Sequence, residues 1–225
     1  MQRRGRSVSD LQDVHAQLRN AILRGDFAPR QRLIEAELAE RYGAGRFVIR
    51  NALLQLAADG LVELQPNRGA RVREISVDEA VEITEIRRAV EGLVAARAAE
   101  QVTDAQIEEL HALGESMTLA VEQGELLRYS DLNATLHSQL REIAGHATAT
   151  RIIEQLNGQM VRHQFRLSLV PGRPSVSLPE HLAIIDAVCD RDSERAGRLM
   201  GEHIGSVIVT LRTLDDQARS MPQVR

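Results

Sequence analysis

Four side chains able to bind a metal ion stand in the C-terminal half of the sequence. Asn133 and His137 are four residues apart, and His181 and His203 follow in other segments with helical periodicity. Positions i and i+4 share one helical face, and histidines from two other helices can complete an inward-facing ligand set. The alternative is three packed histidines and a surface amide, because a lone histidine is more often packed or hydrogen-bonded than ligated. The residues alone leave both readings open.

The residue types narrow the chemistry of such a site. Imidazole-rich ligation without thiolate suits zinc, nickel, iron, cobalt or copper better than calcium or magnesium. A metal with an open position can activate water, so a metal-dependent enzyme acting on a small carboxylate is the alternative function. The sequence contains no HExxH, P-loop, GxSxG or repeated Glu-x-x-His motif. We therefore expect a protein that binds ligands and does not catalyse a reaction.

The elements that carry these residues are predicted to be helices. The segments "SVDE" and "TDAQ" have the pattern of capping boxes, each opening a long amphipathic helix. The Pro/Gly-rich segment 170–179 is expected to be a loop. The pattern predicts an antiparallel all-α bundle of six to seven helices over residues 76–216, with helices at about 76–100, 104–122, 125–144, 147–169, 179–190 and 193–215.

The first third of the chain has a different pattern. Helical segments are predicted at 9–24, 34–43 and 45–60, and two β-rich runs then flank the four-residue turn 66–69. Three short helices followed by a hairpin predict a winged helix-turn-helix over residues 8–74. The fold class is thus mainly α, with a winged DNA-binding domain before a helical domain.

Basic residues gather in this first domain. Residues 1–73 hold 13 Arg and 8 acidic residues, whereas the whole chain has a net charge of −4. Arg46 and Arg50 share one exposed face of the third predicted helix, where either can bind guanine or phosphate. Arg68 and Gly69 can enter the minor groove from the wing. Solvated surface charge is the alternative, but the helix–turn–helix–hairpin order favours DNA.

Residues 18–72 resemble the GntR-type bacterial transcriptional regulators. "LAERYGAGRFVIRNAL" stands where the family favours "LAE.lGVSRTPVREAL", and "GLVELQPNRGARV" is similar to its wing. Both arginines are kept. Gly45 and Phe47 remove two hydroxyls that family members can use on DNA, and Asn51 replaces a common Glu. The resemblance implies winged-helix DNA binding through these positions, with an operator of different sequence.

The helical part is similar to the ligand-binding FCD-type domain of the fatty-acid-regulator-like branch. "EIRRAVEGLVAARAA", "NATLHSQLREIAGH" and "EHLAIIDAVCDRDSERAGRLMGEHI" carry the resemblance. It implies a divalent metal, zinc or nickel above others, and a small organic acid effector contacted by Arg87, which Glu91 could orient or merely bind in a salt bridge. The implied metal ligands are Asn133, His137, His181 and His203. We expect Asn133 to bind the metal directly. Because its amide is neutral, we expect the effector to supply the negative charge that a carboxylate ligand would have provided.

Composition sets the remaining expectations. The single cysteine, Cys189, excludes an internal disulfide, and no apolar run approaches the roughly 18 residues that span a bilayer. The start "MQRRGRS" precedes a polar stretch and not a signal-peptide core. We expect a cytoplasmic homodimer that binds a pseudo-palindromic double-stranded DNA operator and does not contact membranes. We also expect it to repress transcription, with a DNA affinity that its effector modulates.

Overall fold

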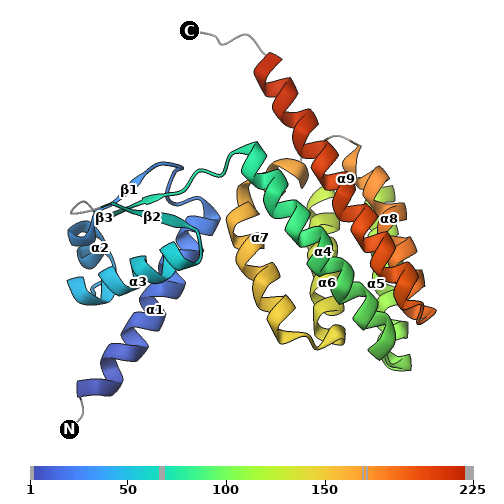
Figure 1. The fold of residues 1–225 in the computed structure, drawn as a ribbon, viewed down its shortest axis with the longest axis horizontal. Helices are drawn as coiled ribbons and strands as arrows, with labels where there is room; N and C mark the ends of the chain where they lie inside the picture. Colours follow the sequence, from blue (N-terminus) through green and yellow to red (C-terminus); the bar gives the residue numbers. More distant parts are fainter. Residues whose placement is uncertain (1–2, 66–68, 169, 171, 221–225) are drawn as a thin grey trace. The chain divides into compact units, whose positions relative to one another are not determined.

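The computed structural model describes residues 3–65, 69–168, 170 and 172–220 of the chain. The chain divides into two compact units. We call the first, Met1–Ile75 with Asn157–Arg162, the head, and the second, Ser76–Leu156 with His163–Arg225, the body. Figure 1 shows the helices that make up most of both units.

The head is a winged helix-turn-helix, as predicted. Its core includes the fully buried side chains of Leu18, Ile49 and Leu56. Gly43 provides the turn between the second and third helices, with φ at +61°, a conformation that glycine adopts without steric cost. The three helices are α1 (Arg3–Arg24), α2 (Glu35–Arg41) and α3 (Arg46–Ala58).

The wing is a three-stranded antiparallel sheet in the order β1-β3-β2. The predicted hairpin supplies β2 (Val62–Gln65) and β3 (Gly69–Val72), and β1 (Arg32–Leu33) pairs with β3 as a third strand. Two residues are too few to show strand periodicity, so β1 was not predicted. Of the predicted turn, residues 66–68, with Arg68, lie outside the described part.

After residue 75 the described chain forms six helices, as the bundle prediction required. Ser76 caps the first of them by accepting a hydrogen bond from the backbone nitrogen of Glu79, and Thr103 and Gln106 form the predicted reciprocal capping box. The helices are α4 (Val77–Gln101), α5 (Asp104–Glu122), α6 (Leu126–Ala144), α7 (Ala147–Ser168), α8 (Arg173–Cys189) and α9 (Ser193–Ser220).

The start of α8 corrects the prediction of a loop at 170–179. Gly172 caps the helix with φ at +77°, and Pro174 lies in the first turn, where a missing N–H breaks no intrahelical bond. Pro179 remains inside the helix, while Ser177 is 4% exposed and donates a hydrogen bond to the Arg173 carbonyl. Pro174 and Ser177 are buried in this first part of α8, so tertiary packing on this side of the helix outweighs the turn signal of the prolines.

Helices α4 and α9 lie side by side in the body (Figure 1). Their backbones meet at two glycines, since a Cβ on Gly92 would lie 3.1 Å from the carbonyl oxygen of Gly197. Helix α4 also packs against α6 and α8, so it contacts each helix that carries one of the three candidate histidines. Within the described part, no helix is both long and apolar enough to cross a membrane.

Candidate metal centre and nucleic-acid interface

Three histidines from three helices converge in the body. His137 on α6, His181 on α8 and His203 on α9 each offer a ring nitrogen, and these nitrogens lie within 4.8 Å of one another. His181 and His203 are 1% and 5% exposed, and their Nε2 atoms are 3.2 Å apart. The structure therefore brings together the three histidines that the resemblance assigned to one metal site.

Two glutamates determine which nitrogen of two rings carries the proton. Nδ1 of His137 lies 2.8 Å from Oε2 of Glu91, and Nδ1 of His203 lies 2.8 Å from Oε2 of Glu180. A carboxylate only accepts, so both rings donate from Nδ1. Each Nε2 then keeps its lone pair, which is the form of imidazole that binds a metal.

The third ring is oriented by a chain of hydroxyl groups. Nδ1 of His181 lies 2.9 Å from the Tyr129 hydroxyl, which lies 2.7 Å from the Ser177 hydroxyl. Ser177 gives its proton to the Arg173 carbonyl at 3.1 Å, so Tyr129 donates to Ser177 and accepts from His181. Burial raises the pKa of Tyr129 to about 12, which keeps the phenol protonated. His181 therefore also presents an unprotonated Nε2.

These partners leave two lone pairs facing each other across the 3.2 Å between His181 and His203. Protonation does not readily relieve this contact, because burial lowers the pKa of both rings. A shared cation would relieve it. Two nitrogens that bind one zinc ion tetrahedrally at about 2.0–2.1 Å are about 3.3 Å apart, so the spacing of the rings suits a metal.

Asn133 meets a second test of fit. It lies one helical turn before His137, and its Oδ1 is one of four buried side-chain polar atoms in the described chain without a hydrogen-bond partner. A buried acceptor left without a donor costs about 1–3 kcal/mol. A cation beside it would satisfy this oxygen. The donor set of three imidazoles and one amide is thus chemically suited to a divalent transition metal.

Arg87 and Glu91, the predicted effector residues, bind each other on α4. Nε and Nη2 of Arg87 donate to Oε1 of Glu91 at 2.9 and 2.6 Å, while the other carboxylate oxygen serves His137. Burial by itself would raise the pKa of Glu91, but the charge of Arg87 and the hydrogen bonds from His137 and Arg87 lower it below its ordinary value. Glu91 thus links Arg87 to the candidate metal ligand His137, and its carboxylate balances the charge of Arg87.

A second, similar network was missed by sequence reasoning. Glu180, which accepts from His203, lies 3.7 Å from Nη2 of Arg173, and the same nitrogen donates to Ser206 at 2.9 Å. Burial would raise the pKa of Glu180, but the hydrogen bonds from His203 and Ser206 and the charge of Arg173 together outweigh this effect, and the pKa is lowered. Arg173 was missed because its segment was expected to be a loop. The acidic neighbour of His181 in "EHLAII" was the available signal for Glu180.

The predicted DNA-reading residues lie at the start of α3, which begins after Gly45. Arg46 is exposed, and no ion pair to it is found among the described residues. Arg50 instead gives two hydrogen bonds of 3.1 Å to the carboxylate of Glu35 on α2. Phe47 is 73% exposed, and Asn51 donates to its backbone carbonyl at 3.0 Å. All five predicted residues therefore lie at the same end of α3. The side chains of Arg50 and Asn51 are hydrogen-bonded within the protein, whereas those of Arg46 and Phe47 are exposed.

Gly69, predicted at the wing tip, is the first residue of β3. Its φ is +81°, and a Cβ there would collide with the Leu33 carbonyl oxygen of the neighbouring strand. The close approach inside the sheet accounts for the glycine.

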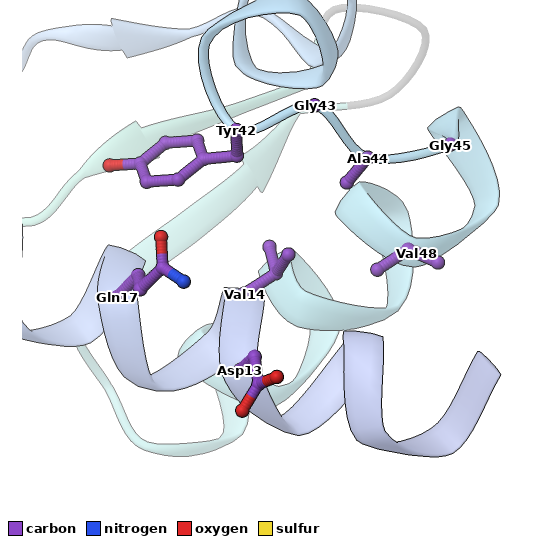
Figure 2. Close-up of a pocket in the computed structure, with 8 residues that line it drawn as sticks. All are labelled: Asp13, Val14, Gln17, Tyr42, Gly43, Ala44, Gly45 and Val48. Carbon is purple, nitrogen blue, oxygen red and sulfur yellow. The ribbon is translucent and has the colours of Figure 1, made fainter. Parts of the chain in front are cut away.

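A hollow of about 290 Å³ lies behind the turn that precedes α3, with walls from α1 and from residues 42–48 (Figure 2). Asp13, Gln17 and Tyr42 give it polar groups.

A winged DNA-binding head and an all-helical body together define a transcriptional regulator. Residues 11–72 match the model "Bacterial regulatory proteins, gntR family", and residues 82–206 match the FCD domain. The chain belongs to the gntR family and carries an FCD domain. This is a family of transcriptional regulators and not of enzymes, in agreement with the missing catalytic motifs.

Two relatives that are named repressors align with most of the chain. The HTH-type transcriptional repressor RspR of Escherichia coli is 30% identical over 90% of this chain and 89% of its own length. The HTH-type transcriptional repressor NanR of Citrobacter rodentium is 29% identical over 92% of this chain and 86% of its own. The solved structure of E. coli McbR/YncC, 24% identical, covers 91% of this chain and 98% of its own with a TM-score of 0.72. It has the same fold.

Proposed function

We propose that this chain is a transcriptional repressor whose body binds a divalent metal and a small carboxylate effector. Binding of the effector changes the affinity of the head for DNA. One observation carries the proposal. All three histidines are hydrogen-bonded through Nδ1 to Glu91, Tyr129 or Glu180, so all three Nε2 atoms are available at one point. Repression is supported by RspR and NanR, both of which are named repressors.

The charges around the centre favour an anionic effector. His137, His181, His203 and Asn133 would hold the metal, zinc or nickel, and all four are neutral ligands. The two nearby arginines are each paired with a glutamate, Arg87 with Glu91 and Arg173 with Glu180, so the net positive charge at the centre would come from the metal. When bound, the metal supplies a Lewis-acidic centre whose charge the protein does not cancel. A small carboxylate, contacted also by Arg87, is the ligand class that fits.

Regulation requires that the effector bind the DNA-competent and DNA-incompetent states with different affinity. We propose that the protein acts in the bacterial cytoplasm. We also propose that it binds a pseudo-palindromic double-stranded operator as a homodimer, because the two heads of a dimer suit two half-sites about one helical turn apart.

Elemental analysis of the purified chain, followed by a thermal-unfolding screen of small mono- and dicarboxylates, tests the proposal. We expect about one divalent metal per chain, and at least one acid that raises the unfolding temperature of metal-loaded but not chelated protein. The same acid should change the affinity for DNA. Absence of metal, or equal stabilisation of chelated protein, would contradict the proposal.

A further inference from the structure

Phe47 has the largest exposed fraction among the large apolar side chains in the described part of the chain, at 73%. It is the second residue of α3. Scattered exposed apolar residues are ordinary on protein surfaces and need no explanation. Phe47, however, lies at the N-terminal end of the recognition helix, at a position where the family favours threonine. Any base that contacts this ring when DNA is bound would affect which operator sequence the protein prefers.

The helical geometry of α3 places Phe47 on the same side of the helix start as Arg46 and Arg50. Side chains in a helix lean toward its N-terminus, so the ring at the second position extends past the first turn. At about 100° per residue, Arg46, Arg50 and Phe47 lie within one sector of about 100°. The N-terminal residues of a recognition helix are those that contact base edges in the major groove. The ring therefore shares the face that the two arginines present.

The other side chains at this end offer little competing contact. Arg50 is bound by Glu35, and the amide of Asn51 donates to the Phe47 carbonyl. Gly45 has no side chain. Among the exposed side chains described at the start of α3, Arg46 and Phe47 thus have no side-chain hydrogen bond, and one is cationic while the other is purely apolar.

The major groove presents one apolar group on its base edges, the C5 methyl of thymine. We propose that Phe47 reads a thymine methyl group, so that each operator half-site holds a T·A pair beneath the start of α3. This inference rests on DNA binding through α3. It adds the base that the helix selects and the atom through which the base is recognised.

Selection of duplexes from a random-sequence library by the full-length protein, and by Phe47→Ala, tests the inference first. Wild type should enrich thymine at one position of each half-site, and Phe47→Ala should lose that preference alone. Deoxyuridine is then placed at that position. Loss of the methyl should weaken wild-type binding about fourfold per half-site, with less than about a twofold effect on Phe47→Ala.

Two controls separate the outcomes. Leu127→Ala removes an apolar side chain that is 70% exposed on α6, and it should keep the wild-type ratio of affinities for thymine and uracil duplexes. Arg46→Ala should weaken binding to both duplexes while keeping their ratio. An equal ratio for Phe47→Ala and wild type would overturn the inference, as would an equal loss on selected and random duplexes. A wild-type protein that binds no duplex would instead refute DNA binding itself.

Discussion

Oε2 of Glu180 lies 2.8 Å from Nδ1 of His203, the same distance that separates Oε2 of Glu91 from Nδ1 of His137. Each glutamate also pairs with an arginine of its own helix, Arg173 on α8 and Arg87 on α4. The body therefore uses the same chemistry twice: an arginine holds a carboxylate, and the carboxylate orients an imidazole. Hydrogen bonds of this kind to the distal nitrogen strengthen metal binding.

Glu180→Gln should weaken metal affinity by about 10- to 100-fold, because the amide is a weaker acceptor that no longer enforces the Nδ1 proton of His203. Competition with a chelating dye measures this affinity. Glu202→Gln is the matched control, since Glu202 neighbours His203 but is exposed and pairs with Arg198. Equal affinities of the two variants would show that Glu180 does not support the site.

His137→Ala combined with His203→Ala should abolish bound metal, because it leaves one imidazole and one amide. Elemental analysis of the purified variant measures the loss. His111→Ala, on the exposed side of α5, should retain the wild-type metal content. Stoichiometric metal in the double variant would exclude these histidines as ligands.

Arg87→Ala should lower the free energy of unfolding by about 3–5 kcal/mol, since it leaves the buried Glu91 carboxylate without its arginine. Urea unfolding measures this change. Arg88→Ala, adjacent but exposed, should alter stability by no more than about 0.5 kcal/mol. If Arg87 also contacts the effector, its variant should respond more weakly to the carboxylate while keeping metal. An unaltered ligand titration would remove it from the effector site.

Arg46→Ala should weaken DNA binding by about 5- to 150-fold, the range of about 1–3 kcal/mol for a bidentate contact to guanine. Arg50→Ala should also weaken binding, but less, because Glu35 already engages its guanidinium. Gel-shift titrations at two salt concentrations measure both. Arg198→Ala in the body is the control, and wild-type affinity of Arg46→Ala would refute the assignment of the recognition helix.

Gly69→Ala should destabilise the head by roughly 2–4 kcal/mol, because a positive φ and a collision with the Leu33 carbonyl act together. Gly25→Ala tests the first effect alone. Its φ is +86° with no atom within 4 Å of the added Cβ, so it should cost about 1–2 kcal/mol. Chemical unfolding followed by circular dichroism compares the two, and similar losses would show that the Leu33 contact yields without cost.

Most of the fold could be predicted because its signals are local. The capping residues Ser76 and Thr103 mark the starts of α4 and α5, and helical periodicity identifies the later helices. Where tertiary packing overrides local signals, prediction failed. Pro174 and Pro179 indicated a loop, yet both lie in α8, where Pro174 is buried in the first turn. The short β1 exists only through its pairing with β3.

The sequence by itself determined which side chains could act on a metal, since Asn133 and His137 share a helical face through covalent spacing alone. The sequence also placed Arg46 and Arg50 on one face at the start of α3, because they are four residues apart. Only the tertiary structure decided that Glu180, Tyr129 and Glu91 hold the Nδ1 atoms, and that Arg50 is bound while Phe47 is free. Helical spacing sets which neighbours share a face, whereas the partner of a buried nitrogen depends on how separate helices pack.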